Sequence, residues 1–405
     1  MKIHAELKSG EQLPRAFTAI PAPSLRNRRI DQIRGISIVL VLLHHFNIAY
    51  HLPDTMLGAV LTPGGVRAIV RNGNYGVTMF FVVSGYLITS HAQKRWGSLS
   101  QISIRGFYVL RIARIMPCLL LLLFIVDALA LSGLSIFGSH IPHTGLPVSA
   151  LLVNAAALTF WMNVLIAHDG WVNYALGVLW SLSVEEVFYL TFPVICLVLR
   201  RQQFLVLFWL AIIAIGPLYR MTHQADESGF LFAYFASFDS IAIGCCSALL
   251  AVDRKLTNSI QLKPSHIRLL QIATLSGMAF LYLYRSIHAT NILGVSLMAL
   301  GTATLLLASG TQRGGPSASR NRLLVIIGWL GQLSYELYLF HLIVLGLLRT
   351  VLPPQTVFGN ARLLLLLVFL ALSTAASAAI ARLYSEPLNR LIRQRLSAEP
   401  DATTR

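Results

Sequence analysis

Ten apolar stretches, each long enough to cross a lipid bilayer, dominate this sequence and exclude an ordinary soluble fold. A membrane-spanning helix needs about 20 consecutive, mostly apolar residues. The stretches lie at residues 35–52, 75–91, 115–133, 178–199, 203–220, 230–251, 268–285, 289–309, 324–351 and 362–383. Of the 405 residues, 56% are hydrophobic and 12% are charged, which is about half the charged share of a soluble domain. The sequence therefore predicts an all-α, polytopic membrane protein with about ten transmembrane helices.

The chain has a net charge of +16, and its basic residues lie mainly in the loops between these stretches. In a soluble protein it would suggest a nucleic-acid partner, but here Lys and Arg gather in short loops between apolar stretches. The positive-inside rule assigns such loops to the cytoplasm, so we expect a lipid bilayer and no nucleic acid as partner. The basic residues on the predicted cytoplasmic side are Lys94, Arg95, Arg105, Arg111, Arg114, Arg200, Arg201, Arg254, Lys255, Lys263, Arg268, Arg313, Arg320, Arg322, Arg390, Arg393 and Arg395. The opposite loops are poorer in basic residues, with Arg67, Arg71 and Arg285 as the main exceptions.

The same alternation predicts how the chain is divided and oriented. Residues 1–30 form a basic tail without the early apolar core of a cleaved signal peptide, so the first span is expected to be an uncleaved anchor. Residues 31–388 form the membrane domain, and residues 389–405 form a second tail. We expect both termini on the cytoplasmic side of the inner, or plasma, membrane. The four cysteines show no metal-ligand spacing, so we expect neither a bound metal nor a disulfide framework.

One further apolar segment, 149–167, breaks the alternation. If it crossed the bilayer, Arg200 and Arg201 would lie outside the cell and every later loop would change sides. We therefore predict that this segment is re-entrant or interfacial. Backbone that does not span can lie at membrane depth only when it is buried in protein or lines a cavity, a place that Asn154, Trp161 and Asn163 would suit.

Arg34 and His45 lie at the two ends of the segment RGISIVLVLLHH in the first predicted span. Eleven residues make about three helical turns, so both side chains point from one helix face, about 16 Å apart. Ionisable side chains inside a bilayer cost at least about 2.5 kcal/mol each and mostly line cavities or relays. We interpret His45 as a candidate catalytic group, the alternative being a hydrogen-bonded core histidine. His44 points about 100° away and is interpreted as a structural or supporting residue.

Two following segments add small and basic residues. The second span, YGVTMFFVVSGYLITS, contains Gly76, Ser84 and Gly85. Small residues usually permit close packing of membrane helices, although Ser84 also suits the wall of a cavity. The segment RGFYVLRIARIMP puts Arg111 and Arg114 on one helix face at the predicted cytoplasmic edge. Their guanidinium groups suit either anionic lipid or the phosphates of a cytoplasmic donor.

Carboxylates occur in several later spans. The segment LWSLSVEEVFYLTFP contains Glu185, Glu186 and Tyr189. The two carboxylates either mark the wet end of a helix, or one of them orients a cavity histidine or holds an acceptor hydroxyl. FASFDSIAIG puts Asp239 in a span, and SYELYLFH puts His341 in the ninth. The C-terminal segment SEP is typical of a helix end.

Taken in order, these segments resemble the acyltransferase-3 family of integral membrane acyltransferases, which includes O-acetyltransferases of lipopolysaccharide O-antigens, exopolysaccharides, Nod factors and macrolides. The resemblance runs from about Asp31 to Pro387. It implies transfer of an acyl group, usually acetyl from acetyl-CoA at the cytoplasmic face, to a hydroxyl of a carbohydrate or glycolipid at the extracytoplasmic side. The SGNH-type C-terminal domain that some members carry is not part of the resemblance.

Carried over residue by residue, the resemblance implies that His45 is the catalytic histidine, with Arg34 as its motif partner and Glu185 as the motif glutamate. The candidate donor-binding residues are Arg111, Arg114, Ser84 and Tyr189. Neutral imidazole is a suitable general base near pH 7, so we expect direct transfer rather than an acyl-histidine intermediate. The alternative function is a transporter or flippase that moves a lipid-linked sugar without acyl transfer. No internal repeat stands out, and this disfavours a transporter built from inverted halves.

Overall fold

The computed structural model describes residues 27–142, 144–252, 263–310 and 321–397. Its α-helices are α1 (Arg28–Tyr50), α2 (Met56–Leu61), α3 (Pro63–Val70), α4 (Asn74–Trp96), α5 (Ile104–Leu131), α6 (Ala150–Leu158), α7 (Met162–Asp169), α8 (Leu179–Leu199), α9 (Gln202–Thr222), α10 (Glu227–Phe232), α11 (Tyr234–Val252), α13 (Pro264–Tyr284), α14 (Ile287–Gly310), α15 (Arg322–Gln332), α16 (Ser334–Val351), α17 (Ala361–Ile380) and α18 (Glu386–Ser397). Of the two predicted tails, 1–30 lies almost wholly outside the described residues, and 389–405 begins within α18.

Helices account for the predicted spans. Within the described residues, nine helical stretches are long and apolar enough to cross a bilayer, and they match nine of the ten predicted spans. The remaining span, 75–91, forms α4, a helix of 23 residues that carries more hydroxyl side chains. A helix of this length rises about 35 Å, which is enough to cross the hydrocarbon core. The prediction of an all-α, polytopic membrane protein is therefore confirmed.

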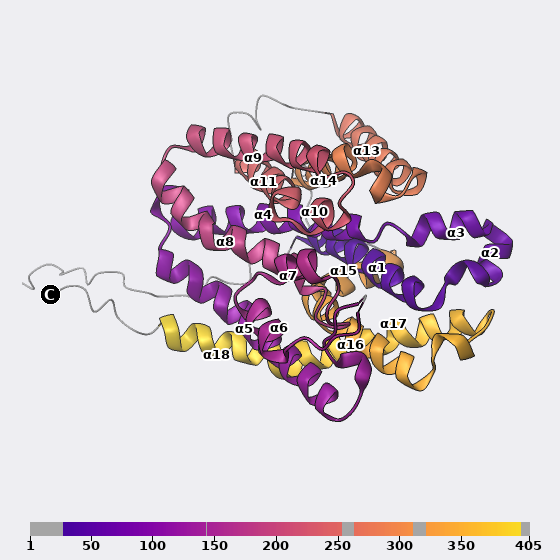
Figure 1. Ribbon diagram of the computed structural model, residues 1–405. Coiled ribbons are helices and arrows are strands. Elements are labelled where there is room, and N and C mark those ends of the chain that lie inside the picture. The colour runs from indigo at the N-terminus through magenta and orange to yellow at the C-terminus, as the bar shows by residue number, and fades with distance from the viewer. Residues whose placement is uncertain (1–26, 143, 253–262, 311–320, 398–405) are drawn as a thin grey trace, which may run out of the picture.

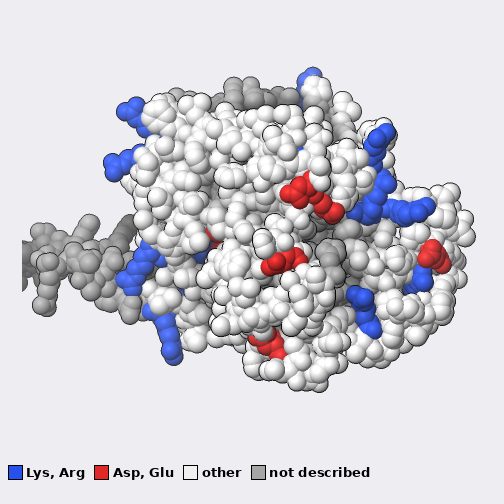
Figure 2. All heavy atoms as spheres, viewed as in Figure 1, with Lys and Arg blue, Asp and Glu red and all other residues white. Residues whose placement is uncertain are grey.

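The long helices run side by side, and the bundle has two distinct ends (Figure 1). The α4–α5 and α8–α9 connections and α18 lie at one end, here called the α18 end, whereas α2 and α3 project at the opposite, α2 end. Figure 2 shows basic side chains at the α18 end, a broad surface with few charges, and both signs of charge toward the α2 end. This distribution fits a band of the bundle that faces lipid. Which end faces the cytoplasm stays a prediction.

Glycines bring α4 into backbone contact with two neighbouring helices. A Cβ added at Gly85 of α4 would lie 2.0 Å from the Ile241 carbonyl oxygen of α11. Conversely, a Cβ added at Gly244 of α11 would lie 2.1 Å from the Val82 carbonyl oxygen of α4. Gly76 of α4 approaches α1 in the same way. The glycines of the second span therefore act in helix packing, which holds α1, α4 and α11 together without room for larger side chains.

The ninth predicted span, 324–351, forms two helices instead of one. α15 ends at Gln332 and α16 begins at Ser334, with Leu333 between them. The break follows Gly331, where an added Cβ would lie 1.7 Å from the Asp31 carbonyl oxygen of α1. α15 thus packs closely against α1, whereas α16 packs against α5 and α17 as well as α1. The break lets the two halves of this segment contact different neighbours.

The prediction that SEP ends the last helix is wrong. α17 passes through a π-helical turn, Ala381–Ser385, and continues directly into α18. Pro387 lacks a backbone N–H and therefore removes one hydrogen bond from this continuous helix, directly after the π-helical turn. The hydroxyl of Ser385 donates to Glu336 Oε1 of α16 at 2.9 Å. The SEP segment therefore connects the C-terminal helix to α16.

The segment 149–167 forms two short helices, α6 and α7, with a break between them. Their nine and eight residues are too few to cross a bilayer, in agreement with the prediction that this segment does not form a spanning helix. Asn154 of α6 donates to Asp127 of α5 at 2.7 Å, and Asn163 of α7 donates to the Phe232 carbonyl at 3.1 Å. Both amide nitrogens are therefore hydrogen-bonded to the bundle, whereas Asn154 Oδ1 and Asn163 Oδ1 are buried without a partner among the described residues.

Candidate active site

A pair of histidines from helices far apart in the chain meets inside the bundle. His45 Nδ1 of α1 lies 3.2 Å from His341 Nε2 of α16. His341 is fully buried and His45 is half-buried. His45 Nδ1 also lies 3.1 Å from the Val41 carbonyl oxygen, one turn earlier on its own helix. We call His45 and His341 the histidine pair.

His44 and Arg34 accompany His45 in the predicted motif, but neither is part of the histidine pair. His44 Nδ1 lies 2.9 Å from the Val70 carbonyl oxygen at the end of α3, a contact that fits a supporting role. Arg34 is half-buried and lies eleven residues before His45 on the same helix, about 16 Å away along the helix axis. It is next to Gly35, where α1 crosses α15. Any partnership between Arg34 and His45 is therefore not a direct contact.

Three other predicted site residues, together with Glu186, come together around Glu185 of α8. Ser84 Oγ of α4 donates to Glu185 Oε1 at 2.8 Å, and the Tyr189 hydroxyl donates to the same oxygen at 2.7 Å. Arg111 Nη2 of α5 lies 2.8 Å from Glu186 Oε1 and 3.6 Å from Glu185 Oε1. The Arg111 guanidinium also stacks on the Tyr189 ring, with its Cζ 3.6 Å from the ring centroid. These five residues are called the Glu185 cluster.

The geometry of Arg111 differs from that of an arginine at the membrane edge. Its guanidinium points into the bundle and is paired with carboxylates, whereas the Arg114 side chain, one turn later, is exposed. Arg111 Nε is buried and has no hydrogen-bond partner among the described residues. A buried N–H without a partner is costly, and a ligand carbonyl or phosphate oxygen would satisfy it. The structure therefore separates the two arginines, which the sequence treats as one pair.

Tyr338 of α16 connects the histidine pair to the Glu185 cluster. Its ring centroid lies 6.1 Å from that of His341, and its hydroxyl lies 2.7 Å from Ser181 Oγ of α8. Ser181 precedes Glu185 by one helical turn, so both lie on the same face of α8. Polar side chains therefore follow one another from His45 through His341, Tyr338 and Ser181 to the Glu185 cluster, with a ring contact between Tyr338 and His341 and one helical turn between Ser181 and Glu185.

Sequence reasoning assigned no role to His341 or Tyr338, although both lie in the segment SYELYLFH. A histidine in the middle of an apolar span is itself a signal, because such residues usually have a partner or a function. Its partner is 296 residues earlier in the chain. Only the packing of α16 against α1 identifies it.

A second buried ionic group lies outside this line. Arg220 of α9 forms a bidentate pair with Asp239 of α11, with Nη2 to Oδ2 at 2.8 Å and Nη1 to Oδ1 at 3.2 Å. Ser296 Oγ of α14 donates to Asp239 Oδ2 at 2.6 Å. Arg220 also donates to the carbonyls of Ala236 and Ile292. We call Arg220, Asp239 and Ser296 the Asp239 cluster; it joins three helices.

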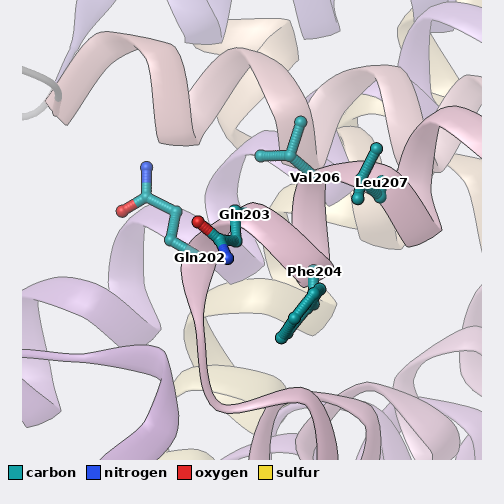
Figure 3. A pocket seen from close by; sticks show the side chains of 5 residues that line it. All are labelled: Gln202, Gln203, Phe204, Val206 and Leu207. Carbon is teal, nitrogen blue, oxygen red and sulfur yellow. The ribbon is translucent and has the colours of Figure 1, made fainter.

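A surface hollow at the start of α9 contains none of the candidate residues. Figure 3 shows its lining, which consists of Gln202, Gln203, Phe204, Val206 and Leu207. These side chains carry no charge and no nucleophile, so the hollow offers no catalytic chemistry. Among the described residues, no three His, Cys, Asp or Glu side chains are grouped as a metal site would require.

Comparison with known proteins agrees with the motif order. The sequence profile of a family described as "Acyltransferase domain" matches residues 27–382. The O-acetyltransferase OatA of Staphylococcus aureus strain NCTC 8325 / PS 47 is 26% identical over 335 residues, which cover 77% of this chain and 49% of OatA. The Bacillus subtilis strain 168 protein YrhL, provisionally named a peptidoglycan O-acetyltransferase, is 26% identical over 330 residues, covering 77% of this chain and 47% of YrhL.

A protein of Staphylococcus aureus strain COL, provisionally named an O-acetyltransferase, is 25% identical over 339 residues, covering 79% of this chain and 51% of that protein. The chain thus spans about half the length of the curated relatives it matches. No solved structure matches the chain significantly.

Proposed function

The chain belongs to the acyltransferase-3 family, whose domain covers residues 27–382, and on this basis we propose that it is a membrane O-acyltransferase. The acyl group is acetyl, taken from acetyl-CoA on the cytoplasmic side of the inner membrane. The acceptor is a hydroxyl of a carbohydrate or glycolipid on the extracytoplasmic side. The observation that carries the proposal is the line of polar groups from the exposed Arg114 end of α5 to the histidine pair.

His45 acts as the general base in this proposal. Its Nε2 accepts the proton of the acceptor hydroxyl while the hydroxyl oxygen forms a bond to the acyl carbon. The bond from that carbon to sulfur then breaks, and the proton passes from Nε2 to the departing sulfur. Every atom is accounted for without an acyl-enzyme, and histidine is suited to both transfers because its reference pKa is about 6.5.

The Glu185 cluster and Arg114 hold the donor. Acetyl-CoA is too polar to cross lipid, so its phosphates stay at the α18 end, where the exposed residue Arg114 provides a guanidinium fork for phosphate. The acyl-bearing arm then extends along α8 toward His45. The unpartnered Nε–H of Arg111 donates to a carbonyl of that arm, while Glu186 orients Arg111 and Glu185 orients Tyr189 and Ser84. Arg34 contributes to the first helix without touching the reacting atoms.

The test compares glycans from four strains: wild type, a deletion, His45→Ala, and the matched control His44→Ala. Surface and secreted glycans are analysed by mass spectrometry. We expect the deletion and His45→Ala to lose one acyl mass increment, and His44→Ala to retain it. The mass of the increment identifies the acyl group, and the glycan that carries it identifies the acceptor.

Two outcomes would contradict the proposal. If the increment survives in His45→Ala while the deletion loses it, His45 is not the base. If all four strains have identical glycans, glycan acylation is excluded. Accumulation of an unmodified lipid-linked sugar on the cytoplasmic side in the deletion strain would then indicate the transporter or flippase alternative.

A further inference from the structure

We propose that His341 is a positioning residue that sets the tautomer of His45, so that Nε2 is the unprotonated nitrogen of His45. This inference rests on the proposed function, in which the unprotonated Nε2 of His45 acts as the general base. The arrangement that supports it, however, consists only of ring nitrogens and backbone carbonyls. It can therefore be tested with and without a transfer assay.

The hydrogen on the His341 ring has only one possible place. His341 Nδ1 lies 3.0 Å from the Leu337 carbonyl oxygen and 2.9 Å from the Tyr338 carbonyl oxygen. A carbonyl oxygen only accepts hydrogen bonds, so Nδ1 carries the hydrogen. A neutral imidazole has a single N–H, and His341 Nε2 is therefore an acceptor. The α16 backbone thus determines which way the His341 ring can bond.

His341, together with the Val41 carbonyl, in turn determines the tautomer of His45. His45 Nδ1 faces two acceptors, His341 Nε2 at 3.2 Å and the Val41 carbonyl oxygen at 3.1 Å. His45 Nδ1 therefore carries the hydrogen and shares it between them, and Nε2 keeps its lone pair. In the opposite tautomer, three acceptors would face one another without a hydrogen, and each unmet buried group costs about 1–3 kcal/mol.

This tautomer is the one that base catalysis at Nε2 requires. When Nε2 takes the hydroxyl proton, the ring becomes cationic and its Nδ1–H still donates to His341 Nε2. A hydrogen bond from a charged donor is stronger than a neutral one, so His341 stabilises the cation without taking its proton. In serine proteases a carboxylate performs this task. Here a second imidazole and backbone carbonyls take the place of that carboxylate.

Two substitutions of His341 separate this role from a packing role. His341→Leu removes the acceptor at similar volume, whereas in His341→Gln the side-chain oxygen can reach the position of Nε2 and accept. Transfer is measured in membranes that contain the full chain, with acetyl-CoA whose acetyl group is labelled and with the endogenous glycan acceptors. We expect His341→Leu to lower kcat about 100-fold with KM for acetyl-CoA unchanged, and His341→Gln to recover at least about tenfold of that loss.

The tautomer itself is read from the ring ¹⁵N signals of histidine-labelled protein in nanodiscs. A protonated and an unprotonated ring nitrogen have well-separated chemical shifts, and His45→Gln identifies the signals of His45 by their loss. We expect an unprotonated Nε2 in the wild-type protein and a larger share of the opposite tautomer in His341→Leu, where only the Val41 carbonyl still accepts from Nδ1. This measurement requires folded protein but no activity.

The outcomes distinguish this inference from the proposed function. A wild-type His45 with an unprotonated Nδ1 overturns the inference, whatever the activity. Equal kcat losses in His341→Leu and His341→Gln, with both proteins folded, also overturn it, because packing alone would then explain the effect. If wild-type membranes transfer no acyl group above the deletion background, the proposed function fails, and the ¹⁵N signals alone decide the tautomer.

Discussion

The Glu185 cluster and the Asp239 cluster are both ionic groups buried in the bundle, but they differ in how completely they are closed. Arg220 and Asp239 have fully inaccessible side chains, and both oxygens of Asp239 are hydrogen-bonded. In the Glu185 cluster, 20% of the Arg111 side chain and 23% of the Glu185 side chain remain accessible. One guanidinium there faces two carboxylates, and Arg111 Nε has no partner among the described residues.

This difference indicates which buried charges serve folding and which serve a ligand. An ion pair without access and with every group satisfied can only hold helices together, here α9, α11 and α14. An accessible cluster with an unmatched charge and an unpaired N–H has capacity left for another molecule. Sequence alone does not separate the two cases, because each presents charged residues inside apolar spans.

The largest expected effect comes from breaking the closed cluster. Arg220→Met leaves Asp239 buried without its cation, which typically costs about 3–5 kcal/mol. We expect this variant to lose most of its folded, monodisperse protein, measured by size-exclusion chromatography and thermal unfolding in detergent. The double variant Arg220→Met with Asp239→Leu removes both charges and should recover much of the stability. A single variant as stable as wild type would show that this pair does not hold the helices.

The next effect compares the same chemical change in both clusters. Glu185→Gln and Asp239→Asn each replace a carboxylate by an amide of nearly equal size. Glu185→Gln should lower kcat/KM for acetyl-CoA about 100-fold with little change in the unfolding temperature, because the amide loses the charge that holds Ser84 and Tyr189 and attracts Arg111. Asp239→Asn should lower the unfolding temperature while the activity per folded molecule is kept. The opposite assignment of the two losses would contradict the distinction between the clusters.

The sequence predicted the spans and most of the residues at the candidate site, but not which residues contact one another. Apolar length identified the spans because every backbone polar group in lipid must be satisfied within a helix. The motifs and the family resemblance placed Ser84, Glu185, Tyr189 and Arg111 among the candidates, and these four side chains do meet. Glu186 makes the closest contact with Arg111, but the sequence did not predict that these two residues are paired.

What the sequence did not predict depends on contacts between distant segments. His341 contacts His45 across 296 residues. Arg220, the partner of Asp239, lies at the end of a predicted span, where a basic residue by itself indicates no partner. The break at Leu333 and the π-helical turn before α18 are likewise not marked by the apolar pattern. Local periodicity carries no information on such crossings, since it reports only which residues share one helix face.

The smallest expected effect comes from a matched pair of serines. Ser84 Oγ donates to Glu185 Oε1, and Ser296 Oγ donates to Asp239 Oδ2. Each alanine substitution removes one hydrogen bond, worth about 1 kcal/mol and more when a buried charge loses a donor. Glu185 Oε1 keeps the Tyr189 hydroxyl and stays partly accessible, so Ser84→Ala should lower kcat/KM only about threefold and leave the unfolding temperature unchanged. Asp239 has no access to water, so Ser296→Ala should lower the unfolding temperature without lowering the activity of the folded protein. If Ser84→Ala destabilises the protein as much as Ser296→Ala does, the two clusters serve the same structural purpose and the Glu185 cluster is not open to a ligand.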